Sequence, residues 1–223
     1  MLWRLETFGT LLAVAQNLFI LCMEPVNSSC ASCQRCPKDP LSKIRDQTRL
    51  MERKARDLSN SYVTHQGLHR NHIDTLCHEA VPGFPKGTIV TQPEMDMLQQ
   101  LYRTMVYMNQ SFQVIREHQQ DLNEPDAILL QELRHAHLAV RGLLSNIVCA
   151  FCVQGASPSP VTIPERPTVT KAFQQKIEGC KVLWNYARFM ERLTKSLREN
   201  RKQVQRTKMG RRQGKKKKAS PGC

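Results

Sequence analysis

The sequence predicts an all-α protein, a long-chain four-helix bundle with up-up-down-down topology. Four segments carry apolar residues at alternating spacings of three and four, which is the periodicity of an amphipathic helix. Two long connections and one short connection join these segments. Because short loops join antiparallel neighbours and long ones permit overhand crossovers, this order of loop lengths favours two parallel pairs of helices.

The first two helices are expected over about residues 40–66 and 92–122. Asp39 and Pro40 supply a cap and a first-turn proline for the first helix, and Gly67 supplies its end. Pro93 opens the second helix. The first stripe is Leu41, Ile44, Thr48, Met51, Ala55, Leu58 and Tyr62; the second is Leu98, Leu101, Met105, Met108, Phe112 and Ile115.

The third and fourth helices are expected over about residues 124–153 and 168–200. Their predicted stripes are Leu130, Leu133, His137, Val140, Leu144, Ile147 and Phe151, and then Phe173, Ile177, Cys180, Trp184, Ala187, Met190, Leu193 and Leu197. The long connections are residues 67–91 and 154–167, and a turn around Asn123 joins the middle helices. Each helix would be roughly 40 to 50 Å long at about 1.5 Å per residue.

The basic residues are concentrated at the C-terminus. Lys and Arg number 33 against 19 Asp and Glu, and residues 198–223 hold most of the excess with Glu199 as their one acidic residue. We therefore expect a mildly basic body, residues 23–197, and a basic, disordered tail, residues 198–223. The tail could bind heparan sulfate or another polyanion, be trimmed as a propeptide, or be a solvated end. No nucleic-acid partner is expected.

Residues 1–22 have the pattern of a secretory signal peptide, with Arg4 ahead of a short apolar run that ends near Cys22. A buried N-terminal helix is the alternative. We therefore expect a secreted, extracellular protein with no membrane insertion after signal cleavage; a mean hydropathy of −0.46 excludes a multi-pass membrane protein. Asn27 and Asn109 begin glycosylation triplets.

Eight cysteines follow the leader and predict a disulfide framework: Cys30, Cys33, Cys36, Cys77, Cys149, Cys152, Cys180 and Cys223. A zinc site is the alternative, since Cys30 with Cys33 and Cys149 with Cys152 have the spacing of a four-thiolate site. In the predicted topology Cys30 and Cys36 lie at the same end of the bundle as Cys149 and Cys152. Cys77 and Cys180 meet at the other end.

Several motifs resemble those of the leukemia inhibitory factor and oncostatin M branch of the interleukin-six cytokine family. They are Cys30 and Cys36 ahead of KIRDQ, Leu76-Cys77, LYRTMVYMNQSF (101–112), RGLLSNIVCAFC (141–152) and AFQQKIEGC (172–180). The resemblance implies the disulfides Cys30–Cys152, Cys36–Cys149 and Cys77–Cys180. Cys33 and Cys223 fall outside this pattern, so either they pair with each other or one is a free thiol.

The resemblance also implies two receptor-binding surfaces. Phe173 and Lys176 match the pair that binds the ligand-specific receptor chain, although periodicity alone favours Phe173 as a core residue. The expected surface for the shared signal-transducing subunit is Gly142, Ser145 and Asn146 on the third helix with Lys43 and Asp46 on the first. The implied partners are heteromeric class I cytokine receptors at the cell surface.

The sequence holds no paired-carboxylate, nucleophile-elbow, glycine-rich or metal-binding histidine motif, so we expect no enzyme activity, no cofactor and no metal. The function expected is that of a secreted cytokine that bridges the two receptor chains and activates kinase-linked signalling. The alternatives are an extracellular heparan-sulfate or polyanion-binding protein acting through its tail, and a cytosolic zinc-binding helical protein.

Overall fold

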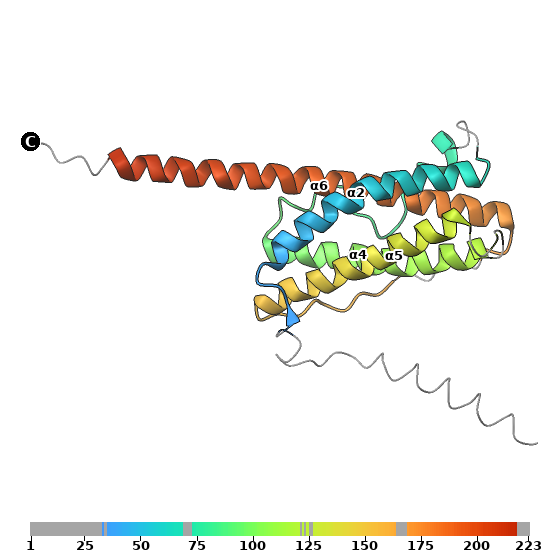
Figure 1. Cartoon of the computed structure of the whole chain (residues 1–223), viewed down its shortest axis with the longest axis horizontal. Coiled ribbons are helices and arrows are strands. Elements are labelled where there is room, and N and C mark those ends of the chain that lie inside the picture. The colour runs from blue at the N-terminus through green and yellow to red at the C-terminus, as the bar shows by residue number, and fades with distance from the viewer. Residues whose placement is uncertain are drawn as a thin grey trace, which may run out of the picture. The chain divides into compact units, whose positions relative to one another are not determined.

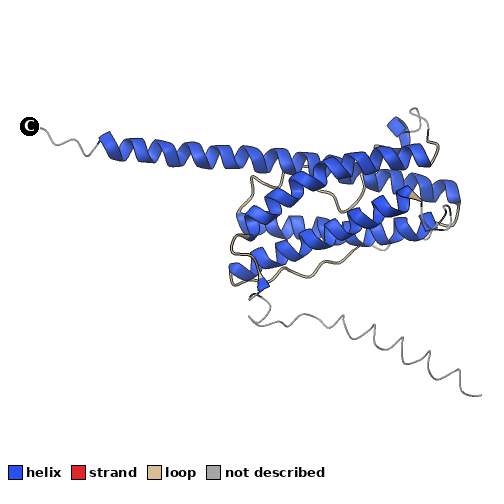
Figure 2. Cartoon of the chain, viewed as in Figure 1, coloured by secondary structure: helices blue, strands red, loops and turns tan. Residues whose placement is uncertain are grey.

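Four long helices form the bundle in the computed structural model of this chain (Figure 1). They are α2 (Pro40–His65), α4 (Glu94–Gln120), α5 (Ile128–Val153) and α6 (Ala172–Lys217), with a short π-helical turn, η2 (Ile73–Cys77), between the first two. The structure describes residues 33, 35–68, 73–120, 122, 124, 127–163 and 169–217. Figure 2 shows helices and loops, and no strand, over these ranges.

The helices run in the up-up-down-down order that the sequence predicts. In Figure 1, α2 and α4 run in one direction, and α5 and α6 run in the other. α2 packs against both α5 and α6, and α4 packs mainly against α5. The chain divides into two units, Met1–Arg35 and Cys36–Cys223, and the whole bundle belongs to the second unit.

Local sequence fixes the helix ends close to the predicted positions. The Asp39 carboxylate accepts a hydrogen bond from the Ser42 backbone N–H at 2.9 Å, and Pro40 occupies the first turn of α2, where a missing N–H costs nothing. Gly67 and Gly155, which follow α2 and α5, have φ values of 65° and 69°. Glycine reaches this left-handed region without steric cost, so both positions end their helices sharply.

One apolar stripe from each helix forms the core. The predicted stripe of the second helix is buried in full along α4, and that of the first is buried in α2 from Ile44 to Tyr62. In α5 the stripe is rotated from the predicted phase: Leu129 and Leu143 are buried, whereas Leu130, His137 and Leu144 are only half-buried. α5 is apolar around much of its circumference, so spacing alone could not fix its phase.

α5 is also, among the described residues, the helix that is long and apolar enough to span a membrane by composition. Its position in the bundle accounts for this property. Leu133, Val140 and Ile147 are fully buried against the neighbouring helices, and Ala150 and Phe151 are nearly so. One face of α5 therefore builds part of the core, while Ile128, Leu138, Val148 and Val153 remain exposed apolar side chains.

The long connection between η2 and α4 is held by an aromatic cluster. The Phe84 ring lies edge-on to Tyr107 of α4 at 5.6 Å and tilted against Phe189 of α6 at 6.1 Å. Gly83 has a φ of 97°, and a Cβ at this position would overlap the Tyr107 ring. Arg192 also donates to the Pro85 carbonyl at 3.1 Å. These contacts hold the crossover against α4 and α6.

Two disulfides fasten the bundle, and both are pairs that the family resemblance implies. Cys36 joins Cys149 with a Cα–Cα distance of 5.4 Å, and Cys77 joins Cys180 at 5.3 Å. The first ties the segment before α2 to the end of α5, and the second ties η2 to α6.

Cys33 and Cys152 are also disulfide-bonded. Because Cys33, Cys149 and Cys152 are oxidised, they are not the thiolate ligands that the zinc alternative required. Cys33 is likewise not a free thiol. Cys30 lies outside the described residues, so the Cys30–Cys152 pair stays a prediction.

The basic tail differs from the disordered segment expected over residues 198–223, because α6 continues as a helix to Lys217. Arg, Lys, Gln and Met are good helix formers, and no proline occurs between residues 168 and 220. Charge composition suggested disorder, but the backbone preferences of the same residues favour helix. The predicted signal peptide, residues 1–22, lies outside the described residues.

Replacing Cys77 and Cys180 together by serine should lower the free energy of unfolding by about 2–4 kcal/mol, because the disulfide closes a long loop in the unfolded chain. Urea denaturation of the oxidised protein would measure this loss. Hydrogen exchange should show faster opening of residues 75–91, while the middle of α4 keeps its protection. A denaturation midpoint equal to that of the wild type would contradict this role.

Candidate functional site

Phe173 and Lys176 lie in the first turn of α6. Phe173 is 58% exposed, which shows that the core interpretation from periodicity alone is wrong; the first core residue of this helix is Ile177. Lys176 is half-exposed. Residues three apart on a helix share a face, so the ring and the ammonium group lie side by side at the surface. The helix start thus offers an apolar ring beside a cation.

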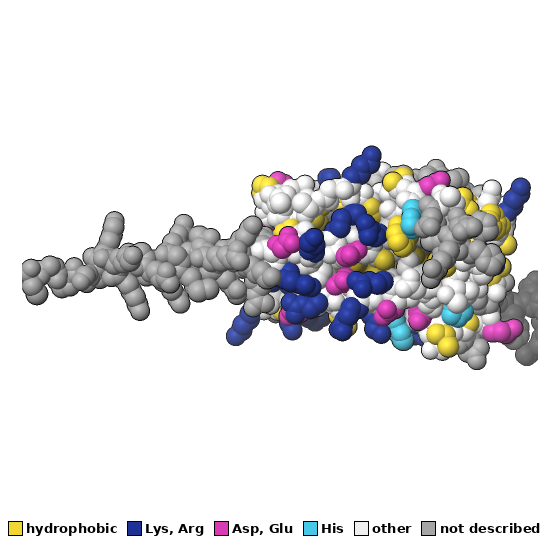
Figure 3. Space-filling view, turned by 90° about the horizontal axis from the view of Figure 1, so that it is seen from above, with side chains coloured by type: hydrophobic (Ala, Val, Ile, Leu, Met, Phe, Trp, Pro, Cys, Tyr) yellow, Lys and Arg dark blue, Asp and Glu magenta, His cyan; other side chains and the backbone are white. Residues whose placement is uncertain are grey.

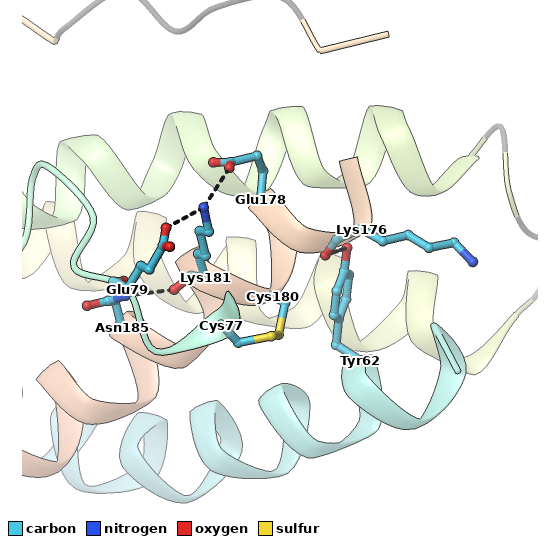
Figure 4. The surroundings of a disulfide bond; sticks show 8 residues. All are labelled: Tyr62, Cys77, Glu79, Lys176, Glu178, Cys180, Lys181 and Asn185. Carbon is cyan, nitrogen blue, oxygen red and sulfur yellow. Dashed lines mark hydrogen bonds and ion pairs between the residues drawn. A yellow bond between two sulfur atoms is a disulfide. The ribbon is translucent and has the colours of Figure 1, made fainter. Parts of the chain in front are cut away.

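A buried hydrogen-bond chain supports this turn from inside. The Tyr62 hydroxyl of α2 donates to the Lys176 carbonyl at 3.2 Å (Figure 4). The same hydroxyl accepts from Gln119 Nε2 at 3.3 Å. Gln66 Nε2 donates to Gln119 Oε1 at 2.7 Å. Burial raises the pKa of Tyr62, so the hydroxyl stays protonated and keeps donating to Lys176.

Gly179 makes room for this contact. A Cβ at Gly179 would overlap the Tyr62 hydroxyl, so a residue without a side chain is needed for α2 and α6 to approach so closely. The next residue, Cys180, carries the disulfide to Cys77 (Figure 4). Tyr62, Gly179 and the disulfide therefore fix the start of α6 on the bundle.

Lys181 adds an electrostatic link between α6 and the crossover. Its ammonium group lies 2.7 Å from the Glu79 carboxylate and 3.2 Å from that of Glu178 (Figure 4). The hydrogen bond to Glu79 is the main cause that raises the pKa of Lys181. Asn185 donates to the Glu79 backbone carbonyl at 2.8 Å, which holds Glu79 in place.

The seam between α2 and α5 is the second candidate surface. Gln47 Nε2 donates to the Ala139 carbonyl at 3.0 Å, and Asn146 Nδ2 donates to Gln47 Oε1 at 2.7 Å. A Cβ on Gly142 would lie 3.0 Å from Gln47 Nε2, so the glycine leaves space for the Gln47 side chain. Gln47 therefore connects Gly142 and Asn146, which the sequence singled out, to α2.

The remaining predicted residues of this surface are solvent-accessible. Gly142 and Ser145 are exposed on α5, and Lys43 and Asp46 are exposed on α2. Leu50, 55% exposed, follows on the same face of α2. Sequence reasoning did not single out Gln47, although its spacing of four from Lys43 and three from Leu50 places it on their face.

Asn109 lies in the middle of α4, where it is half-buried and accepts a hydrogen bond from His137 Nε2 at 2.9 Å. Its triplet partner Ser111 is fully buried, with its hydroxyl donating to the Tyr107 carbonyl. Glycosylation of Asn109 stays a prediction, and Asn27 lies outside the described residues. Within the described ranges, no three His, Cys, Asp or Glu residues are placed to share a metal ion.

Comparison with known proteins then identifies the family. The model of the LIF / OSM family matches residues 39–197, from the cap of α2 to the last core turn of α6. This chain belongs to that family. It is a cytokine of the interleukin-six family, a signalling ligand and not an enzyme.

Three oncostatin M sequences illustrate how far the likeness of this LIF / OSM cytokine extends. Rat oncostatin-M (Rattus norvegicus) is 28% identical over 81% of this chain and 76% of its own length. Bovine oncostatin-M (Bos taurus) is 28% identical over 95% of this chain and 82% of its own length. Human oncostatin-M (Homo sapiens) is 28% identical over 78% of this chain and 76% of its own length. The family match does not favour the polyanion-binding alternative, since residues 198–223 lie beyond it.

Gly179→Ala should destabilise this cytokine by about 1–3 kcal/mol, because the added methyl group displaces the Tyr62 hydroxyl. Tyr62→Phe alone should cost about 0.5–1.5 kcal/mol through the lost hydrogen bonds. The double variant should lose less than the sum, because phenylalanine removes the hydroxyl oxygen, the nearer of the two Tyr62 atoms that the methyl group overlaps. Urea denaturation of all four proteins measures the coupling, and additive losses would contradict the proposed fit.

Proposed function

We propose that this cytokine bridges a ligand-specific receptor chain and a shared signal-transducing receptor subunit at the cell surface. The LIF / OSM match makes class I cytokine receptors the partners of its family. The observation that carries the proposal is Phe173, a large ring that is 58% exposed in the first turn of α6, whereas Tyr186 and Phe189 of the same helix are buried.

The first surface, Phe173 and Lys176, binds the ligand-specific chain. An exposed aromatic side chain buries a large apolar area on binding at little cost in conformational entropy, and a neighbouring cation orients the partner. The turn that presents the pair is held by Tyr62 and by the disulfide one turn further on. Such preorganisation reduces the entropy lost on binding.

The second surface binds the shared subunit. It comprises Gly142, Ser145 and Asn146 of α5 with Lys43 and Asp46 of α2. Support comes from the exposure of Gly142 and Ser145, which lets a partner backbone approach closely, and from Gln47, which orients the Asn146 amide. Leu50 adds an exposed apolar side chain on α2, as interface centres often have.

The spacing of the two surfaces suits the simultaneous binding of two receptor chains. Tyr62 contacts the turn of the first surface, and Gln47 contacts the second surface. Both residues belong to α2, so the anchoring points are about 22 Å apart along the helix at 1.5 Å per residue. Two receptors held at this distance bring their cytoplasmic kinases together.

Secretion is part of this proposal. Receptor bridging at the cell surface requires an extracellular ligand, and the leader pattern of residues 1–22 favours export. The disulfides Cys36–Cys149 and Cys77–Cys180 are of the kind that persists in an oxidising compartment.

Replacing Phe173 and Lys176 together by alanine should weaken binding to the ligand-specific receptor chain by about 30-fold or more, the loss expected for a binding hot spot. Surface plasmon resonance with the isolated receptor ectodomains measures this loss. Binding to the shared subunit should be unchanged. Val153→Ala with Lys195→Ala is the matched control, since it removes an exposed apolar side chain and a cation elsewhere. Equal affinities for the double variant and the control would refute the first surface.

Gly142→Arg should abolish binding to the shared subunit, because a long side chain replaces the only position on this surface that has no side chain. Affinity for the ligand-specific chain should remain within about twofold, since distant sites act independently. The variant should therefore occupy receptors without activating them in a reporter-cell assay. Gly87→Arg, at an exposed glycine with open space around it, is the control and should signal normally. Full signalling by the Gly142 variant would exclude the second surface.

A further inference from the structure

A basic groove lies between α4 and α5, on the side of α5 that faces away from α2. Its volume is about 490 Å³, and guanidinium groups from both helices line it: Arg116 of α4 with Arg134 and Arg141 of α5. His137, two leucines and two glutamines complete the lining. Neither proposed receptor surface includes any of these residues.

The described residues that line this groove carry a net positive charge. None of its lining residues is acidic, and none of its three arginines takes part in an ion pair within the described residues. The face of the bundle in Figure 3 differs, since Lys and Arg side chains lie there among Asp and Glu side chains. Three guanidinium groups around one concavity, with no acidic residue among the described lining residues, attract an anion.

His137 forms a structured wall of the groove. Its Nε2–H donates to Asn109 Oδ1 at 2.9 Å, and its Nδ1 lies 3.5 Å from Arg116 Nη1. Burial, followed by the charges of Arg116 and Arg141, lowers the pKa of His137. The imidazole is therefore neutral at physiological pH. The lowered pKa of His137 partly reflects the positive charges of Arg116 and Arg141 nearby.

We infer that this groove binds a sulfated saccharide unit of an extracellular glycosaminoglycan. Guanidinium groups pair with sulfate oxygens through two parallel hydrogen bonds. Leu130 and Leu138 offer apolar contact to the faces of sugar rings, and the Gln120 amide offers a partner for a hydroxyl group. The volume is far larger than one sulfate ion needs, since a water molecule takes about 30 Å³ of the liquid.

The groove shares no residue with either proposed receptor surface. The groove occupies the α4 side of α5, whereas Gly142 and Asn146 contact Gln47 on the α2 side. The second receptor surface adjoins the groove, because Arg141 directly precedes Gly142 and lies one helical turn before Ser145. The site is distinct from residues 198–223 and does not depend on them.

The test measures binding of a heparin-derived hexasaccharide to the full chain by isothermal titration calorimetry. Arg134→Gln with Arg141→Gln should weaken binding by about tenfold or more, the loss expected for two charge-assisted hydrogen bonds. Arg49→Gln with Arg53→Gln removes the same charge from exposed positions on α2 and is the matched control. The control variant should lose clearly less affinity for the hexasaccharide than the variant with Arg134 and Arg141 replaced. Equal losses in the two variants would show binding by overall charge and overturn the proposal.

Nuclear magnetic resonance titration of His137 gives a readout at the site itself. The hexasaccharide should raise the pKa of His137, because its sulfate groups neutralise Arg116 and Arg141. An unchanged His137 pKa at saturating hexasaccharide would place the binding elsewhere on the chain. Inorganic sulfate or phosphate at the same concentration should have little effect. A full response to either ion alone would identify a simple anion site and refute saccharide recognition.

Discussion

The close contact between α2 and α6 at Gly179 is the constraint on which the rest of the arrangement depends. Because Gly179 has no side chain, the Tyr62 hydroxyl reaches the Lys176 carbonyl across the interface. The Cys77–Cys180 disulfide closes at the next residue of α6 and ties the crossover to the same place. The start of α6, which presents Phe173, is thus set by packing, hydrogen bonding and a covalent bond together.

The topology and the helix bounds, apart from the C-terminal end of α6, could be predicted from sequence because capping residues, apolar spacing and loop lengths are local signals. Other features depend on tertiary contacts and could not. Periodicity placed Phe173 in the core, but burial begins only at Ile177, where α6 meets its neighbours. The phase of α5 was missed for a related reason, since an apolar residue such as Leu130 fits the spacing whether or not it is buried.

The residues of the candidate surfaces also divide into those that the sequence could predict and those that depend on tertiary contacts. The exposed pair at the start of α6 and the small residues of α5 could be found from motifs, whereas Gln47 could not, because its importance lies in hydrogen bonds to residues far away in sequence. The hydrogen bonds that link Gln66, Gln119 and Tyr62 could not be predicted from the sequence either. Polar residues buried between helices satisfy one another only in the folded state, and their sequence spacing carries no trace of this pairing.

α5 contacts three different environments: the core, the seam with α2 and the groove beside α4. Its buried face builds the core, its α2 side carries small residues and amides around Gln47, and its α4 side carries arginines. Each side follows from the neighbour it meets: glycine and amides allow close approach to α2, and guanidinium groups on long stems reach over the groove beside α4. The α2 and α4 sides adjoin at Arg141 and Gly142, so a substitution at this boundary should affect the contacts of both sides.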